Sequence, residues 1–256
     1  MTKRFGFTLA EVLITLGLIG VVAAMTIPNL IANTNGAKFR SQFKKSISTL
    51  SQAGLMSQAQ YDFDYAGTTE ACGDATDHPE ETMTMCAVLN GTLTGQTYVA
   101  NPFGENGLKR NSNGTQVPYA LEQVYTIDDS ADYHAYTLAD GSIVAFKADA
   151  VGCELPIGTQ LTGEVLQAAG EGEGAAPAGG LNGCLGFIDV NGVTLPNKEV
   201  SCAGEDGANE ASLDVQTPCA VSNKARYMTD IFPIVFHDAV VEPASDAAKY
   251  VLTSSK

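Results

Sequence analysis

The hydrophobic pattern of this chain begins with one long apolar run. From Phe7 to Ile27 every residue except Glu11 is apolar, small or threonine. A run of about twenty such residues is long enough to cross a bilayer as a helix. Pro28 ends it. The pattern therefore predicts a membrane-compatible helix over residues 7–28 that carries a single acidic side chain near its start.

A different period follows the proline. Large apolar residues now recur at steps of three to five with polar residues between them, which is the pattern of an amphipathic helix. They are Phe39, Phe43, Ile47, Leu50 and Leu55. A helix with such a stripe needs a partner surface. We expect it to run to about residue 60 against a sheet, with a flexible joint at Asn33, Asn35 and Gly36.

The residues around the start of the run form a recognisable motif. Lys3 and Arg4 precede Gly6-Phe7-Thr8-Leu9-Ala10-Glu11. This segment resembles the N-terminus of type IV prepilins and type II secretion pseudopilins. The resemblance implies cleavage after Gly6 and methylation of the Phe7 amine. Glu11 would be the fifth mature residue and Pro28 the twenty-second, with Gly20 and Ala23-Ala24 also in register.

An ordinary secretory signal peptide is the alternative interpretation. Lys3 and Arg4 would be its basic region, residues 12–22 its apolar region and Val22-Ala23-Ala24 its cleavage site. Two features oppose it. Glu11 places a charge at the front of the apolar region, and the helical pattern continues beyond Pro28.

Glu11 is costly to place in a membrane. A carboxylate at the bilayer centre costs about 2.5–3.5 kcal/mol on insertion scales, so it needs a partner or a route to water. After cleavage the Phe7 ammonium would lie about 6 Å away along the helix axis. In the resembled family this glutamate pairs with the N-terminal amine of a neighbouring subunit. The alternative is a carboxylate that only reaches the membrane interface.

Length and charge set the limits for the rest of the chain. The 256 residues divide into a leader at 1–6, a long helix at 7–60 and an exported domain at 61–256. The formal charge of −15 disfavours nucleic-acid binding, because phosphate backbones attract Lys and Arg. A basic cluster just beyond the apolar run would face anionic headgroups or acidic neighbours, or would be a solvated helix face. Its members are Lys38, Arg40, Lys44 and Lys45.

The exported domain reads as a sheet with long loops. Residues 133–138 and 143–146 flank Asp140-Gly141 and predict a β-hairpin. Further strands are expected at 121–127, 185–190, 231–236 and 250–253, with a low-complexity loop at 170–180. The predicted fold class is α+β, with one long N-terminal helix on a C-terminal antiparallel sheet.

Six cysteines lie in the predicted exported domain. They are Cys72, Cys86, Cys153, Cys184, Cys202 and Cys219. An even number in an exported chain indicates a disulfide framework whose connectivity the sequence does not fix. We expect neighbours along the chain to pair, which would pin the loops. Zinc is disfavoured because no two cysteines are closely spaced and histidine is scarce.

One loop has the residue types of a cation site. Asp189 and Asn191 offer alternating oxygen atoms, and Asp206 follows within reach of a folded-back chain. The full helix-loop-helix calcium signature is absent. Certain pseudopilins bind calcium in a C-terminal loop, so the resemblance makes calcium the one possible cofactor. The alternative is a turn capped by the Asp and Asn side chains.

No catalytic motif stands out. The three histidines, His78, His134 and His237, lie in no nucleophile or metal motif. The prediction is a non-enzymatic filament subunit of a type IV pilus or a secretion pseudopilus. The alternative is a minor or tip subunit that acts as an adhesin. The expected partners are copies of itself or other pilins, a prepilin peptidase, the assembly machinery and the inner membrane. The expected final location is a periplasmic or cell-surface filament.

Overall fold

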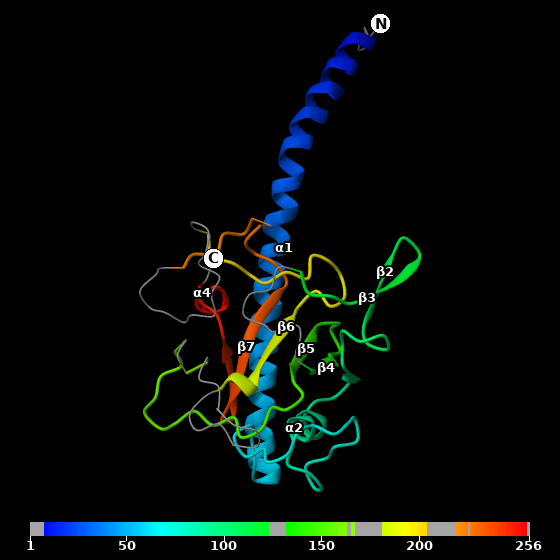
Figure 1. The fold of residues 1–256 in the computed structure, drawn as a ribbon. Coiled ribbons are helices and arrows are strands. Elements are labelled where there is room, and N and C mark those ends of the chain that lie inside the picture. Colours follow the sequence, from blue (N-terminus) through cyan, green and yellow to red (C-terminus); the bar gives the residue numbers. More distant parts are fainter. Residues whose placement is uncertain are drawn as a thin grey trace, which may run out of the picture.

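A computed structural model describes residues 8–122, 132–162, 165–166, 181–203, 219–224 and 226–254. One long helix, α1 (Leu9–Tyr61), lies along a six-stranded antiparallel sheet with the strand order β1-β4-β5-β6-β7-β8 (Figure 1). Two shorter helices, α2 (Met85–Thr92) and α4 (Asp246–Thr253), flank it. The predicted α+β class is therefore confirmed.

The strands are short. Those of the main sheet are β1 (Thr97–Ala100), β4 (Tyr133–Thr137), β5 (Ile143–Lys147), β6 (Leu185–Asp189), β7 (Ile231–His237) and β8 (Val240–Pro243). A separate two-stranded hairpin consists of β2 (Lys109–Ser112) and β3 (Thr115–Pro118), and a 3-10 turn, η1 (Asn182–Cys184), precedes β6.

The second half of α1 packs as its stripe predicts. Phe39, Phe43, Ile47 and Leu50 are all buried, and the Phe43 ring stacks on Phe232 of β7 with centroids 4.2 Å apart. Leu55, the last member of the predicted stripe, is instead 55% exposed. The helix ends at Tyr61, and its C-cap Asp62 adopts a left-handed conformation with φ of 66°.

The flexible joint predicted at residues 33–36 is absent, because α1 is continuous there. Gly36 is buried, and a Cβ at this position would lie 3.2 Å from Cβ of Asn223 and 3.3 Å from Cγ of Met228. The glycine therefore marks a close approach between α1 and the loop before β7. The sequence pattern could not distinguish this role from a break.

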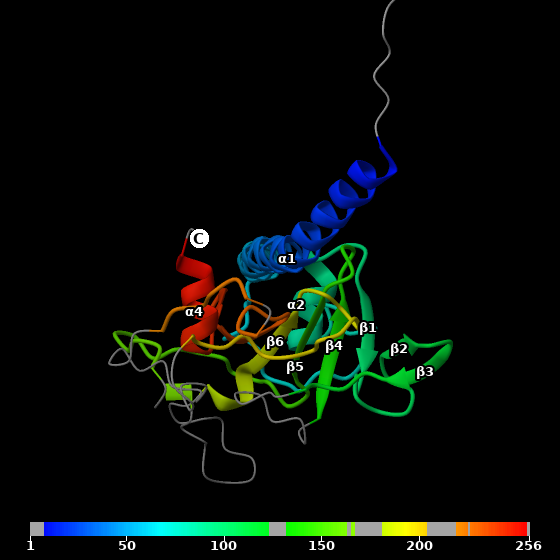
Figure 2. The same cartoon turned by 90° about the horizontal axis from the view of Figure 1, so that it is seen from above.

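The central strands are buried on both faces. Val144, Phe146 and Ile188 lie in the core beneath α1, whereas their neighbours Ala145 and Phe187 lie in a second cluster on the opposite face. Figure 2 shows α1 above one face of this sheet, with the β2–β3 hairpin standing to one side. The sheet therefore separates two cores.

Four of the predicted strands are confirmed. Those at 133–138, 143–146, 185–190 and 231–236 correspond to β4, β5, β6 and β7. The strand predicted at 250–253 is wrong, because these residues belong to α4. Ser245 caps that helix by accepting a hydrogen bond from the Ala248 N–H, and Ala247, Ala248 and Val251 are buried at helical spacing. The edge of the sheet is formed by β8 instead. Most of the predicted strand at 121–127 and the whole loop at 170–180 lie outside the described residues.

Three disulfides close loops of the domain. Cys72 pairs with Cys86, Cys153 with Cys184 and Cys202 with Cys219, with Cα–Cα distances of 5.4, 5.7 and 5.2 Å. These are the neighbouring pairs along the chain. Cys72, Cys153 and Cys202 lie outside the helices and strands of the described chain. Closing a loop of about 15 residues stabilises by about 3 kcal/mol in the chain-entropy model.

Gly54 is a sharp test of how α1 packs. A Cβ there would lie 2.6 Å from the Ala239 carbonyl oxygen and 2.8 Å from Cε2 of Tyr65. Gly54→Ala should therefore lower the free energy of unfolding by about 1–3 kcal/mol. This loss would outweigh the gain of about 1 kcal/mol in helix propensity. Urea unfolding of the detergent-solubilised full chain measures it.

Gly17→Ala is the matched control, since a Cβ at Gly17 meets nothing within 4 Å. It should leave the unfolding of the domain unchanged. If Gly54→Ala stabilises the protein as an ordinary helical substitution would, the close approach at this position is refuted.

Candidate functional site

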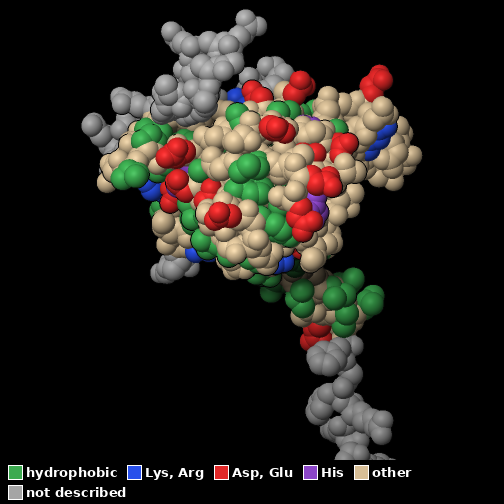
Figure 3. All heavy atoms as spheres, turned by 90° about the horizontal axis from the view of Figure 1, so that it is seen from below, with side chains coloured by type: hydrophobic (Ala, Val, Ile, Leu, Met, Phe, Trp, Pro, Cys, Tyr) green, Lys and Arg blue, Asp and Glu red, His purple; other side chains and the backbone are tan. Residues whose placement is uncertain are grey.

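The first half of α1 is an apolar rod that no other part of the described chain covers. Its large hydrophobic side chains are between 43% and 79% exposed from Leu9 to Ile31. The most apolar window of 18 residues in the helix has a mean hydropathy of 2.2 and is 0% buried. Figure 3 shows this part projecting from the domain, with one acidic side chain near its described end. It is the one helix among the described residues with the length and composition to cross a membrane.

Glu11 closes a capping box at the start of this rod. Its Oε2 accepts hydrogen bonds from the Thr8 N–H at 2.8 Å and the Thr8 hydroxyl at 3.0 Å. The Glu11 N–H in turn donates to the Thr8 hydroxyl oxygen at 3.2 Å. Such a box satisfies N–H groups that a helix start leaves without partners. This role of Glu11 was not predicted from the sequence, although the spacing Thr-x-x-Glu is its signature.

Of the other residues predicted to act at the N-terminal end of α1, the structure describes two. Gly6 and Phe7 lie outside the described residues. Gly20 and Pro28 both lie within the continuous helix, and a Cβ at Gly20 would meet nothing within 4 Å. Figure 1 shows the apolar half leaning away from the packed half, and Pro28, which cannot donate a helical hydrogen bond, stands between them.

The basic cluster beyond the apolar run is largely used inside the chain. Buried Arg40 donates to the Ser254 hydroxyl and to the Val251 carbonyl, and Lys44 donates to the Ser254 carbonyl at 2.8 Å. Lys45 forms an ion pair with Asp140 at 2.8 Å. Burial would raise the pKa of Asp140, but hydrogen bonds from Lys45 and Ser142 outweigh it and lower this pKa to about 2. These three cations hold α1 against the hairpin turn and the C-terminus.

The structure describes only part of the predicted cation loop. Asp189 is fully buried, and its Oδ1 accepts a hydrogen bond from the Asn191 N–H at 3.0 Å, which is the capped turn of the alternative interpretation. Its Oδ2 accepts from the Tyr119 hydroxyl at 2.7 Å. The Asn191 side-chain amide donates to the carbonyls of Thr194 and Leu195. Asp206 lies outside the described residues.

The structure adds a second acid that the sequence did not indicate. Burial and the nearby Asp230 raise the pKa of the Asp189 carboxyl well above its usual value. Burial also raises the pKa of Asp230 to about 6, although Asp230 accepts hydrogen bonds from the N–H groups of Asn197 and Lys198. Asn197 is fully buried, and its Oδ1 has no hydrogen-bond partner. We call Asp189, Asp230 and Asn197 the buried acid site.

Comparison with known proteins identifies the N-terminal segment. Residues 1–27 match the prokaryotic N-terminal methylation motif. This match supports recognition of the N-terminal segment as that of a type IV pilin-like or pseudopilin-type precursor. No curated protein and no solved structure matches the chain. The motif belongs to a structural family whose members are typically non-enzymatic, and it fits a precursor anchored by an apolar N-terminal helix.

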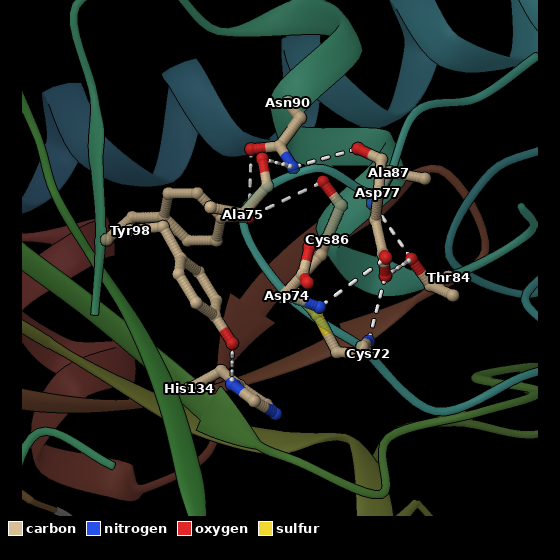
Figure 4. Close-up of a disulfide and its surroundings, with 12 residues drawn as sticks. Cys72, Asp74, Ala75, Asp77, Thr84, Cys86, Ala87, Asn90, Tyr98 and His134 are labelled. Atoms are coloured by element: carbon tan, nitrogen blue, oxygen red, sulfur yellow. Dashed lines mark hydrogen bonds between the residues drawn. A yellow bond between two sulfur atoms is a disulfide. The ribbon is translucent and has the colours of Figure 1, made fainter. Parts of the chain in front are cut away.

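The Cys72–Cys86 disulfide anchors an acidic loop (Figure 4). Asp77 accepts hydrogen bonds from the Gly73 N–H at 2.9 Å and the Thr84 hydroxyl at 2.8 Å. The Asp77 carboxylate and the two sulfur atoms lie within 4.8 Å of one another, which is the spacing of a metal site. Because the two sulfur atoms are bonded to each other, they are not free thiolates that could bind a metal ion. The group therefore has a structural role.

The three histidines lie in separate places in the structure. The His78 ring meets Tyr61 edge-on, His134 hydrogen-bonds the Tyr98 hydroxyl, and His237 lies between Asp238 and Glu242. Within the described parts of the chain, none of them hydrogen-bonds a serine, threonine or cysteine side chain. They therefore form no nucleophile–base pair there.

His237 makes stability depend on pH. Burial disfavours the imidazolium, but hydrogen bonds to Glu242 and Asp238 outweigh this effect and raise the pKa of His237. A raised pKa in the folded state stabilises the protein below the unfolded value of 6.5, and this contribution is lost as pH rises through the folded value. The free energy of unfolding should therefore fall as pH rises above about 6.5.

Urea unfolding of the full chain between pH 6 and pH 8.5 tests this dependence. His237→Gln should flatten the fall, whereas His78→Gln, at an exposed position, should leave it intact. An equal slope in the wild type and in His237→Gln would contradict the role of His237.

Proposed function

We propose that this chain is a structural subunit of a type IV pilus-like or type II secretion pseudopilus filament. The observation that carries the proposal is the uncovered apolar half of α1, which bears a single acid and follows the methylation motif. Cleavage after Gly6 would free the Phe7 amine for methylation. The prepilin peptidase and the assembly machinery are the proposed partners, and the inner membrane holds the precursor.

The apolar half of α1 supplies the cohesion of the proposed filament. Exposed apolar surface is stabilised by about 25 cal/mol for each Å² removed from water. In the precursor the bilayer covers this surface. Once the subunit is extracted, bundling against the same helix of neighbouring subunits is the arrangement that covers it again. The α1 helix is about 80 Å long, so its apolar half reaches well beyond the domain.

In the proposed filament, Glu11 fixes how neighbouring helices align along the bundle. Its capping box with Thr8 satisfies backbone groups within one subunit, but no cation among the described residues pairs with its negative charge. The methylated Phe7 amine keeps its positive charge and, on a neighbouring subunit, would neutralise Glu11. A charge-assisted hydrogen bond of this kind is stronger than a neutral one, especially away from water.

Variants of Glu11 separate capping from pairing. Glu11→Val removes the charge and the cap, and Glu11→Gln keeps a capping acceptor but no charge. Both should insert in the membrane at least as well as the wild type, since the cost of a buried carboxylate of about 2.5–3.5 kcal/mol is removed. Both should strongly reduce the yield of sheared filaments.

Mass spectrometry of sheared filaments provides the second measurement. The wild-type terminus should be an N-methylated Phe7. Normal filament yield from Glu11→Gln would show that capping is sufficient and would refute the pairing. A mature chain that begins after Ala24 would refute the filament proposal as a whole, because the apolar helix would be lost.

We further propose that calcium binds at the buried acid site. Two buried carboxyls with raised pKa values and an unpartnered Asn197 Oδ1 are oxygen donors of the kind calcium prefers. Asp189, Asp230 and Asn197 would hold the ion, together with the predicted Asp206. When bound, calcium would neutralise the repulsion between the two carboxylates.

Calcium at millimolar concentration should raise the melting temperature of the full chain. Asp230→Asn should abolish this rise, whereas Glu80→Gln, at an exposed acid, should preserve it. The absence of any shift in the wild type would leave the site as a pair of protonated or hydrogen-bonded acids and would refute calcium binding.

A further inference from the structure

The β2–β3 hairpin is an arm that stands apart from the main sheet. Within the described residues its two strands pair only with each other, and Figures 1 and 2 show it projecting from the side of the domain. Its base is fixed, because the Leu108 N–H donates to the Pro102 carbonyl and the Tyr119 N–H donates to the Leu108 carbonyl, at 2.9 and 2.8 Å. Leu108 and buried Tyr119 join the second core cluster.

The conformation of the β2–β3 arm is fixed by its turn and not by the packing of a hydrophobic core. Asn113 and Gly114 both have positive φ, of 52° and 83°, as a two-residue hairpin turn of the favoured hand requires. The Asn111 side chain accepts a hydrogen bond from the Gly114 N–H at 2.9 Å. Between Lys109 and Pro118 the only large apolar side chain is Val117. An isolated two-stranded hairpin is marginally stable, so this arm gains from a partner surface.

The arm carries positive charge on an acidic protein. Lys109 and Arg110 are the first cations after Lys45, and as adjacent strand residues they lie on opposite faces of the ribbon. Neither forms an ion pair or a side-chain hydrogen bond with the described residues. In contrast, Arg40, Lys44 and Lys45 all bind groups within their own domain.

The connection between α1 and α2 is acidic, opposite in charge to the arm. Residues 62–84 contain seven acids and no Lys or Arg, namely Asp62, Asp64, Glu70, Asp74, Asp77, Glu80 and Glu81. The Cys72–Cys86 disulfide and the hydrogen bonds of Asp77 hold this segment in place. Glu70, Glu80 and Glu81 are exposed and have no ion-pair partner in the described part of the chain. Figure 3 shows acidic side chains spread over the face seen from below.

The arm and the acidic connection lie apart in one subunit. In Figure 1 the hairpin stands to one side of the sheet, and the connection around α2 lies at the far end of α1. Two different patches that complement each other on identical chains form a heterologous contact. Such contacts extend into an open helical filament when the rotation does not close a ring.

We propose that the β2–β3 arm of one subunit docks through Lys109 and Arg110 on the acidic α1–α2 connection of a second copy of this chain. This inference rests on the proposed filament function. It assigns the exported domain a lateral contact that is separate from the helix bundle. Charge complementarity across this contact selects the neighbour and fixes its orientation.

Charge reversal and charge exchange test the contact in cells that express the full chain. Lys109→Glu with Arg110→Glu should lower the yield of sheared filaments roughly tenfold, because like charges then face each other at every repeat. Adding Glu80→Lys and Glu81→Lys should restore the yield. Lys224→Glu with Arg226→Glu changes two exposed cations elsewhere by the same total charge and should leave the yield unchanged.

Zero-length carbodiimide cross-linking locates the contact directly. In filaments assembled from a mixture of isotopically labelled and unlabelled subunits, the Lys109 amine should be joined to Glu80 or Glu81 of a differently labelled copy. The link should disappear in Lys109→Gln.

The outcomes separate the two proposals. Normal filaments from the arm reversal, or failure of the charge exchange to restore them, would overturn the arm contact and leave the filament proposal standing. A Lys109 link confined to one copy would do the same. If the wild type forms no filaments and no intermolecular link, the filament function itself fails.

Discussion

The structure depends on one helix, α1, whose two halves lie in different surroundings. From Gly36 to Ser57, α1 buries a stripe against the sheet, and the Phe43–Phe232 stack lies at its centre. From Leu9 to Ile31 the same helix has no part of the described chain to cover it. Exposed apolar surface of this kind is unfavourable in water. In the proposed filament, bilayer covers it before assembly and neighbouring subunits cover it afterwards.

The C-terminal domain holds this helix through several kinds of contact. The sheet is buried on both faces, and cations of α1 bind the C-terminus and the β4–β5 turn. Close approaches at Gly36 and Gly54 bring α1 against backbone and side chains of the domain. These contacts fix α1 to the domain, as the proposed extraction of a subunit from a membrane would require.

Acidic groups serve three different purposes in this chain. Glu11 lies in an apolar segment and caps its own helix, Asp189 and Asp230 are buried together, and the acids between α1 and α2 lie mostly at the surface. The environment decides the chemistry in each case. A carboxylate in an apolar setting needs a counter-charge, a buried pair needs a proton or a cation, and an exposed cluster offers a surface to a basic partner.

The sequence alone determined the long helix, its division at Pro28, the methylation motif and the central strands, because these are local patterns of hydrophobicity and spacing. It did not reveal that Gly36 packs instead of bending, that residues 250–253 are helical, or that Asp230 lies near Asp189. It also did not show that Arg40, Lys44 and Lys45 bind within the domain. Each of these depends on contacts between residues far apart in the chain. Tertiary structure alone decides them, since burial and partner choice are set by what the fold brings together.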